Sequence, residues 1–328
     1  MTGYSEDILD CLVIGGGPAG LTAALYLARF KRSFLVVDSG SPRANWIPTS
    51  HNIPFFAEGI SGSTILKRQR EHAERYGARI IEGLISDLQK QPGSFIATLE
   101  TKINGKQQIR ARRVLLATGA QDIEPAFPDL PDAVQRGLVR YCPICDGYEA
   151  RDQKIAVIGH GAHGLGEAIF IARTYADDVT LLTLGKQMDL DQKQRERAIK
   201  YGIKVLESPV DTLEIQGDRI TALRIDGAET GFDVLYSALG LRFRTELAFA
   251  LGAQHDDTGA LIVDDHNQTT VSGLYAAGAI VRGLDQIVVA MGHSAVAATH
   301  IHNQCELPTE EEPDGTEERK RGHSPLLA

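Results

Sequence analysis

Two cysteines separated by two residues are the groups in this sequence best suited to redox chemistry. Cys142 and Cys145 occur in the segment Arg-Tyr-Cys-Pro-Ile-Cys-Asp-Gly, residues 140–147. This spacing allows the two sulfurs to close a small disulfide ring, and Pro143 restricts the backbone between them. Such a pair exchanges electrons readily with other thiols and disulfides. The segment therefore predicts a redox-active dithiol.

A zinc half-site and a pair of reduced core residues are the two alternatives for these cysteines. A zinc site would need His160 and His163 as further ligands, but both fall within a glycine-rich loop that must stay close to a strand. Core cysteines rarely stand beside the Pro, Asp and Gly residues found here, which mark an exposed turn. The redox pair is the preferred interpretation, and both alternatives stay open.

The first part of the chain predicts a βαβ unit. Residues 8–14 are apolar and β-branched, as in a buried parallel strand. The helix after them repeats apolar residues along one face, and residues 34–38 form a second apolar strand. The unit spans about 30 residues, which is the size expected of a nucleotide-binding unit.

The loop between that strand and helix has the glycine spacing of a dinucleotide site. Gly15, Gly17 and Gly20 leave room for a pyrophosphate, and the helix beyond them offers free N–H groups and a positive dipole end. Asp38 ends the second strand, where a carboxylate can accept hydrogen bonds from an adenosine ribose. A glycine-rich turn without a ligand is the weaker alternative, because strand, helix and acid all agree. We predict one dinucleotide site here.

A second unit with the same order follows the cysteines. Residues 154–158 predict a strand, and Gly159, Gly161 and Gly164 repeat the glycine spacing. The strand after the next helix ends without an acid or an arginine, and Lys186 is the nearest cation. An NAD site favours a carboxylate there, and an NADP site favours a cation for the 2′-phosphate. The sequence is compatible both with a working NADPH site and with one that does not bind the nucleotide.

The two units predict an α/β protein with two Rossmann-like, three-layer nucleotide-binding domains. The rest of the chain contains no third glycine fingerprint, so we expect it to return and complete the first domain. The expected FAD-binding domain is residues 1–120 with 245–305, and the inserted domain is residues 121–244, which carries the cysteine pair. Short polar junctions at 120–125 and 241–245 suit hinges.

Composition indicates a globular protein whose partner is a small molecule or another protein. The chain has 328 residues, 43% of them hydrophobic, and a formal net charge of −9. This charge opposes binding to nucleic acid, which depends on clustered Lys and Arg. No apolar run reaches the length of about 18 residues that suggests a membrane span.

Targeting signals are also missing from the sequence. The first ten residues lack the basic start and apolar core of a signal peptide, and four cysteines are too few for a secreted disulfide scaffold. We therefore expect a cytoplasmic protein. Residues 306–328 form a charged C-terminal tail, which we expect to be mobile or held only by contacts to other parts. We hypothesise that it folds over the dithiol cleft and restricts partners.

The order of these motifs resembles the low-molecular-weight thioredoxin reductases, a class of FAD-dependent pyridine nucleotide-disulfide oxidoreductases. The match rests on the first glycine loop, Ala117-Thr-Gly119, the Cys-Pro-Ile-Cys-Asp-Gly motif and the second glycine loop, in that order. It extends from Asp7 to about Asn303. The resemblance implies a homodimer with FAD on the outer domain and the dithiol and nicotinamide site on the inserted domain. A rotation of that domain would bring the dithiol and the nicotinamide site in turn to the flavin.

The same resemblance gives roles to the site residues. Cys145 would meet the flavin, Cys142 would exchange with the substrate, and Asp146 would be the acid–base residue beside them. Electrons would pass from the donor through FAD to this pair, and on to a thioredoxin-like protein or a small disulfide. The residues expected to contact FAD are Gly15, Gly17, Pro18, Ala19, Gly20, Asp38, Ala117, Thr118, Gly119, Gly278, Ala279, Gln286 and Ile287.

The chain departs from the family pattern at two places. Ala279 stands where family members usually have Asp, so we expect one ribityl hydrogen bond to be missing, at a cost of about 1–3 kcal/mol that FAD binding should survive. The family's His-Arg-Arg phosphate clamp would fall near residues 183–185 and is absent. Some relatives without it take electrons elsewhere, for example from ferredoxin. Asp285 and His293 follow the second FAD stretch, and we expect them to face solvent.

The leading hypothesis is thus a flavoprotein disulfide reductase of the thioredoxin reductase type. One alternative is a flavin disulfide reductase that is linked to ferredoxin or otherwise independent of NADPH. A ferredoxin–NADP reductase shares both folds but lacks a dithiol. A flavin-binding sensor without turnover is a further alternative, suggested by the incomplete donor loop and by Ala279.

Overall fold

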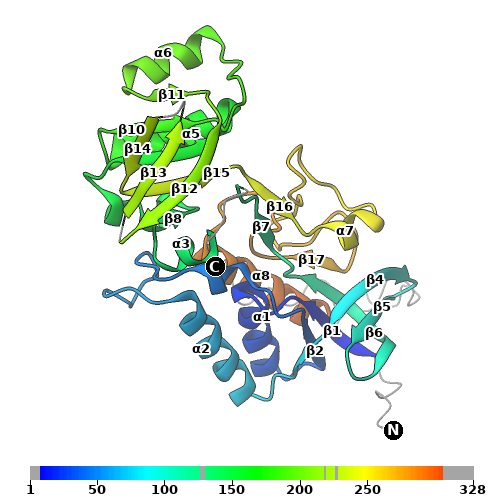
Figure 1. Cartoon of the computed structure of the whole chain (residues 1–328). Helices are drawn as coiled ribbons and strands as arrows, with labels where there is room; N and C mark the ends of the chain where they lie inside the picture. The colour runs from blue at the N-terminus through cyan, green and yellow to red at the C-terminus, as the bar shows by residue number, and fades with distance from the viewer. Residues whose placement is uncertain (1–7, 126–129, 218, 226–227, 306–328) are drawn as a thin grey trace, which may run out of the picture.

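Two α/β folds joined by a short two-stranded ribbon make up the chain. The computed structural model describes residues 8–125, 130–217, 219–225 and 228–305. The first fold lies in the lower half of Figure 1, and the second lies above it. The expected α/β class with two nucleotide-binding folds is confirmed. The predictions for the first residues and for the tail at 306–328 lie outside the described residues.

The first fold is built on a mixed sheet with the strand order β3-β2-β1-β6-β5-β4, and β17 pairs with the far part of β6. Strands β1, β2, β3, β6 and β17 run parallel, whereas β5 pairs antiparallel with both β6 and β4. Their bounds are β1 Leu9–Ile14, β2 Phe34–Asp38, β3 Ile80–Glu82, β4 Leu84–Gln91, β5 Ser94–Thr101, β6 Gly105–Leu116 and β17 Leu274–Ala276.

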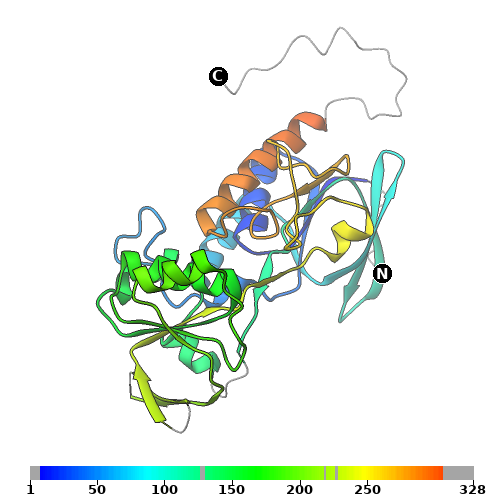
Figure 2. The same ribbon diagram turned by 90° about the horizontal axis from the view of Figure 1, so that it is seen from above.

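The register of β17 shows that the end of the chain returns to the first sheet. Leu274 pairs with Val114, and Ala276 pairs with Leu116. The final helix α8 (Ile287–Gln304) then packs against α1 (Pro18–Arg29), as Figure 2 shows from above. The second fold is therefore inserted in the first, as expected from the missing third glycine fingerprint.

The sheet of the first fold is buried on both faces. In β1, Cys11 and Val13 contact the helices α1, α2 (Gly62–Arg75) and α8, while Leu12 and Ile14 join a second core cluster on the opposite face. That second cluster includes Ala248 of the short helix α7 (Glu246–Ala250). Burial on both faces explains why β1 is a continuous apolar run.

The second fold has a five-stranded parallel sheet with the order β11-β10-β9-β15-β8. A three-stranded antiparallel sheet and the helices α3, α5 and α6 accompany it. The bounds are α3 Leu130–Gln135, β8 Val139–Arg140, β9 Ile155–Gly159, α5 Gly161–Thr174, β10 Val179–Leu182, α6 Gln192–Lys200, β11 Lys204–Leu206, β12 Val210–Gln216, β13 Arg219–Ile225, β14 Ala228–Phe232 and β15 Val234–Ala238.

The two folds are connected by the antiparallel strands β7 (Ala120–Asp122) and β16 (Leu241–Phe243). One strand leaves the first fold and the other returns to it, so both crossings occur side by side (Figure 1). The hydroxyl of Thr118 donates to the carbonyl of Arg244 at 2.6 Å and ties the ends of the ribbon together.

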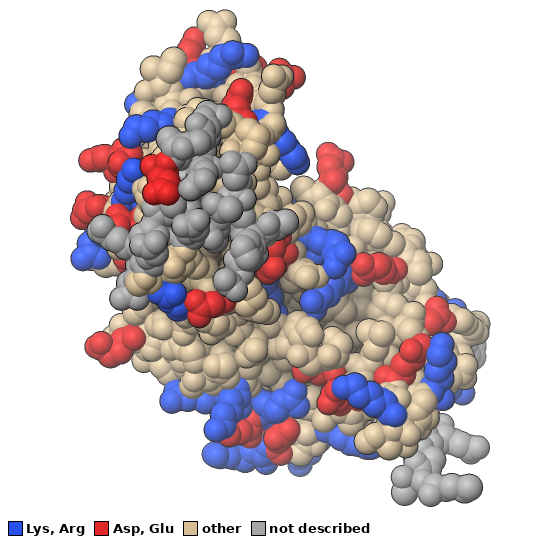
Figure 3. Space-filling view, in the orientation of Figure 1, with Lys and Arg blue, Asp and Glu red and all other residues tan. Residues whose placement is uncertain are grey.

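Among the described residues, no helix has the length and apolar character needed to cross a membrane. Lys and Arg side chains alternate with Asp and Glu over the face shown in Figure 3, including the part of the second fold near α6.

Candidate active site

A cavity of about 690 Å³ is enclosed between the glycine loop of the first fold and the cysteine turn of the second. A cavity of this size suits a bound cofactor or small ligand. All the FAD candidates except Gly20 line it, as do both cysteines and Asp146: Gly15, Gly17, Pro18, Ala19, Asp38, Ala117, Thr118, Gly119, Cys142, Cys145, Asp146, Gly278, Ala279, Gln286 and Ile287. Residues from both ends of the sequence are thus gathered around one space.

The first glycine loop has no room for a side chain at Gly15 or Gly20. Gly15 adopts φ +111°, a conformation that L side chains rarely adopt, and a Cβ there would lie 2.7 Å from the carbonyl carbon of Ala117. Gly20 faces away from the cavity, where a Cβ would meet the carbonyl group of Gly15, so it permits close packing of α1 on β1. Gly17 is the N-cap of α1 and provides no side-chain cap.

Asp38 ends β2 with only 9% of its surface exposed. Its carboxylate accepts a 3.1 Å hydrogen bond from the backbone N–H of Gly40 and a 3.1 Å contact from the guanidinium of Arg70 on α2. Arg70 gave no signal in the sequence, because its partner is 32 positions away. The uncapped start of α1 and the bare backbone at Gly15 fit the pyrophosphate of FAD. The fixed carboxylate of Asp38 fits its ribose.

The two cysteines form a disulfide, with their Cα atoms 5.3 Å apart. Cys142 is the N-cap of the short helix α4 (Pro143–Asp146), and its carbonyl accepts from the N–H of Cys145 at 2.9 Å. Neither alternative for the pair holds, because both cysteines are partly exposed and disulfide-bonded. The described residues contain no cluster of potential metal ligands. His160 instead caps α5.

Gln286 connects the dithiol to the first fold. Its amide Nε2 lies 3.3 Å from Sγ of Cys142 and 3.4 Å from Sγ of Cys145. Asn52 fixes the orientation of this amide, because its Nδ2 donates to Oε1 of Gln286 at 2.8 Å. Ser50 in turn donates to Asn52 at 2.8 Å. Sequence analysis missed Ser50 and Asn52, which lie in an irregular loop with no motif.

Asp146 is a largely buried carboxyl group beside the dithiol. Burial raises its pKa, against the opposing effects of the Arg140 guanidinium and of the hydrogen bond from Tyr236. The Tyr236 hydroxyl donates to Oδ1 of Asp146 at 2.8 Å, and Nη1 of Arg140 lies 3.8 Å from the same oxygen. A carboxyl group with a raised pKa retains its proton more easily and can donate it to a leaving thiolate.

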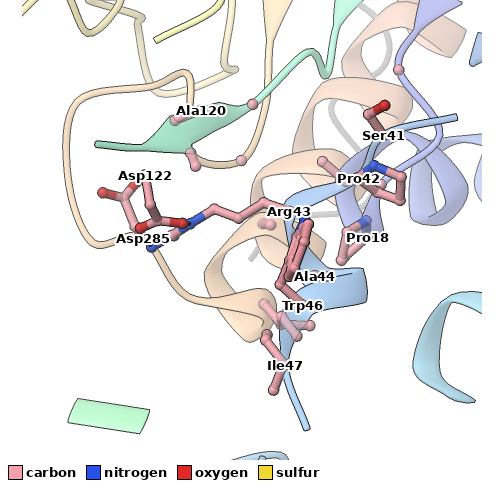
Figure 4. A pocket seen from close by; sticks show the side chains of 18 of the residues that line it. Pro18, Ser41, Pro42, Arg43, Ala44, Trp46, Ile47, Ala120, Asp122 and Asp285 are labelled. Carbon is pink, nitrogen blue, oxygen red and sulfur yellow. Dashed lines mark hydrogen bonds and ion pairs between the residues drawn. The ribbon is translucent and has the colours of Figure 1, made fainter. Parts of the chain in front are cut away.

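A charged cluster lies against another wall of the cavity. Arg43, in the 3-10 helix η1 (Arg43–Trp46), donates two hydrogen bonds of 2.6 Å to Asp122 of β7. In Figure 4 the Arg43 side chain extends toward both Asp122 and Asp285. Burial raises the pKa of Asp285 to about 6, an effect that Arg43 opposes and Asp122 reinforces.

The expectation that Asp285 and His293 face solvent is wrong for Asp285 and only partly met for His293. Asp285 lines the cavity, because the loop before α8 turns it toward Arg43 and Asp122. His293 is half-buried on α8, and its Nδ1 is enclosed without a hydrogen-bond partner in the described part of the chain. Exposure of these residues depends on how the loop before α8 and the helix itself pack, which their sequence neighbourhood does not reveal.

The second glycine loop does not reach this cavity. Gly159 and Gly164 are in close contact, since a Cβ on Gly159 would lie 2.9 Å from the Cα of Gly164. Gly161, with φ +63°, begins α5. Lys186 is exposed, and its Nζ lies 3.5 Å from Nε2 of His160. These four predicted residues share one edge of the second fold, away from the dithiol.

Comparison with known proteins agrees with this geometry. Residues 9–294 match the family model described as pyridine nucleotide-disulphide oxidoreductase. The chain is 32% identical to the thioredoxin reductase of Streptomyces coelicolor over 89% of this chain and 92% of the relative. It is 29% identical to that of Listeria monocytogenes, over 92% and 95% of the two chains.

A solved structure shows the same likeness in three dimensions. The thioredoxin reductase of Streptococcus pyogenes superposes with a TM-score of 0.82 at 27% identity, over 91% of this chain and 98% of the other. The resemblance is thereby confirmed, and the chain is an FAD-dependent disulfide oxidoreductase. When FAD is bound, it acts as a two-electron carrier. The chain therefore belongs to the pyridine nucleotide-disulphide oxidoreductase family, within the low-molecular-weight thioredoxin reductase class.

Proposed function

We propose that this flavoprotein reduces a disulfide in a thioredoxin-like protein or in a small molecule, with Cys142 and Cys145 as its exchanging pair. The observation that carries the proposal is the contact of Gln286 with both sulfurs, because it brings the disulfide of the second fold into the cavity built by the first. The named relatives are thioredoxin reductases, which supports a thioredoxin-like partner.

The roles within the pair follow from the resemblance. We assign contact with the flavin to Cys145, exchange with the substrate to Cys142, and proton donation to Asp146. The raised pKa of Asp146 supports the last role. Ile144 lies between the two cysteines and Tyr148 follows them; they are 47% and 63% exposed, which offers apolar surface to a docking disulfide.

A homodimer is part of the proposal. Val288 and Met291, at the start of α8, are 39% and 37% exposed, and Leu284 in the loop before the helix is 50% exposed. Val288 and Met291 are three residues apart on one face of the helix, and a second copy of the chain could cover these apolar side chains. Light scattering after size-exclusion chromatography should give a dimer mass, and Met291→Asp should shift it toward the monomer.

We also propose domain boundaries at residues 120/121 and 244/245, as the sequence suggested, with the ribbon of β7 and β16 as the hinge. A cytoplasmic location agrees with the two cysteines outside the active pair, Cys11 and Cys305, which are free thiols.

The test of function uses the purified holoprotein without oxygen. The flavin is reduced with dithionite, excess reductant is removed, and oxidised thioredoxin or a small aromatic disulfide is added. Wild type should reoxidise its flavin and release thiols in step with it, whereas Cys142→Ser and Cys145→Ser should not. Cys305→Ser is the matched control and should behave as wild type. Equal thiol release by the Cys142→Ser variant would refute the dithiol relay.

A further inference from the structure

The loop after β10 in the second fold differs from what a nicotinamide nucleotide requires. Thr183 is 1% exposed, and its hydroxyl has no hydrogen-bond partner within the described residues. Leu184 adopts φ +55° and packs on the core cluster beneath the sheet. A left-handed backbone is strained for a bulky residue, so this packing has to hold it. The two positions that follow the strand therefore present neither a carboxylate for a ribose nor a cation for a phosphate.

Met188 covers the place where a pyrophosphate would bind. Its side chain is 9% exposed and belongs to the core cluster around α5. The Sδ atom accepts from the backbone N–H of Gly161, at 3.2 Å, and Gly161 is the first residue of α5. Dinucleotide folds bind the pyrophosphate through free N–H groups at this helix end. Here the N–H is directed at a thioether, which is a weak acceptor.

Acidic groups stand beside this covered helix end. The carboxylate of Glu207 accepts from the N–H of Met188 at 2.7 Å and holds the loop in place. Asp191 caps α6 through a capping box with Gln194. Lys186 approaches His160, the N-cap residue of α5, at 3.5 Å, and Nε of Arg195 donates to the carbonyl of Leu190 at 2.8 Å. Exclusion of a phosphate therefore depends on Met188, which covers the N–H of Gly161, and on the carboxylate of Glu207, and not on a lack of cations.

We propose that Met188 and Leu184 exclude reduced nicotinamide nucleotides from the second fold, so that this enzyme does not take its electrons from NADPH or NADH. The second Rossmann fold then serves to carry the dithiol. This inference rests on the proposed disulfide reductase function and concerns only its electron donor.

Binding is tested separately from turnover. Oxidised NADP⁺ is titrated into the full-length holoprotein and followed by calorimetry, which needs no redox reaction. Wild type should show a Kd weaker than about 1 mM. In a second experiment, NADPH or NADH is mixed with the holoprotein without oxygen, and the yellow colour should persist. Dithionite added to the same sample should bleach it, and the bleached protein should then reduce a disulfide.

Two variants test whether Leu184 and Met188 are the residues that exclude the nucleotide. Leu184→Arg with Met188→Ala supplies a guanidinium for the phosphate and frees the N–H of Gly161, so it should bind NADP⁺ at least about tenfold more tightly than wild type. Met188→Ala alone should give a smaller gain, and it guards against misfolding of the double variant. Met291→Ala, which alters a methionine on α8 outside this fold, is the control and should leave NADP⁺ binding unchanged.

The outcomes are distinct. Micromolar binding of NADP⁺ by wild type, or bleaching of wild type by NADPH, overturns the inference. If wild type does not bind and neither variant gains affinity while both still exchange disulfides, then Met188 and Leu184 do not exclude the nucleotide. If dithionite-reduced wild type fails to reduce any disulfide, the proposed function fails, and the binding result still stands on its own.

Discussion

The hydroxyl of Tyr236 donates a 2.8 Å hydrogen bond to Oδ1 of Asp146, which adjoins Cys145. Tyr236 is fully buried in β15, 90 residues further along the chain. The bond therefore links the rigid centre of the second sheet to the turn that carries the dithiol. It lowers the pKa of Asp146 and partly offsets the increase due to burial. Five predictions concern this site and its surroundings.

Asp146→Asn should slow disulfide reduction by about 100-fold, because the carboxyl group can no longer donate a proton to the leaving thiolate. In wild type the rate should fall as the pH rises through the raised pKa of Asp146, whereas the variant should lack this dependence. Single-turnover oxidation of the reduced holoprotein by a disulfide measures both. Asp189→Asn, at an exposed position of the second fold outside the cavity lining, is the control. A variant as fast as wild type would exclude Asp146 as the proton donor.

Tyr236→Phe should move the same pH profile to higher pH. The variant keeps the ring and its packing but removes a bond that lowers the pKa of Asp146. Loss of a partner from a buried carboxyl group should also reduce the free energy of unfolding by about 1–3 kcal/mol. Chemical denaturation and the pH dependence of single turnovers provide the two measurements. An unshifted profile would mean that the Tyr236 hydroxyl has no effect on the protonation of Asp146.

Glu167→Gln should remove a pH dependence of stability. Burial raises the pKa of Glu167 on α5 from 4.5 to about 7, and the charge of Asp122 adds to the increase. The folded protein then keeps a proton that the unfolded chain loses. The contribution of Glu167 to the free energy of unfolding is therefore fully present below pH 4.5 and is lost as the pH rises through about 7.

The variant should therefore be more stable than wild type at pH 8 by on the order of 1–3 kcal/mol, and equal to it at pH 4. Thermal unfolding of the holoprotein across this range measures the difference. Glu58→Gln, at an exposed position, provides the comparison and should follow wild type. Parallel curves for wild type and Glu167→Gln would contradict the assignment.

Arg43→Met should destabilise the protein by about 1–3 kcal/mol, because it leaves the largely buried carboxylate of Asp122 without its bidentate partner. It should also raise the pKa of Asp285 above its value of about 6, since Arg43 opposes that increase. Adding Asp122→Asn should recover part of the loss, and this double-mutant cycle measures the coupling directly. Additive losses would show that the pair contributes no stability of its own.

Ala279→Asp should strengthen FAD binding. Ala279 lines the cavity at the position where the family usually has a carboxylate, and one added hydrogen bond to a polar ligand contributes about 1 kcal/mol or more. An increase of about tenfold in affinity is expected from reconstitution of the apoprotein with FAD. Ala295→Ser, on α8 outside the cavity lining, serves as the control. Unchanged affinity would mean that the carboxylate is not within reach of the ribityl chain.

Sequence alone determined the parts of this protein that depend on local geometry. The glycine spacing at Gly15, Gly17 and Gly20 predicted the strand-to-helix turn, and at Gly15 and Gly20 only a residue without a side chain permits its backbone and contacts. The alternation of apolar residues located the strands and helices around it. The spacing of Cys142 and Cys145 predicted their disulfide, since four consecutive residues decide whether the two sulfurs can meet.

Only the tertiary structure decided which distant groups share the cavity. Asn52 orients Gln286 across 234 positions, and Tyr236 reaches Asp146 across 90. Such contacts arise from the packing of whole elements, and no local pattern marks them. The burial of Asp285 and the contact of Met188 with the N–H of Gly161 likewise depend on how the loops that carry these two residues fold. Local sequence sets the conformations that the chain can adopt, while packing between the folds sets which side chains meet.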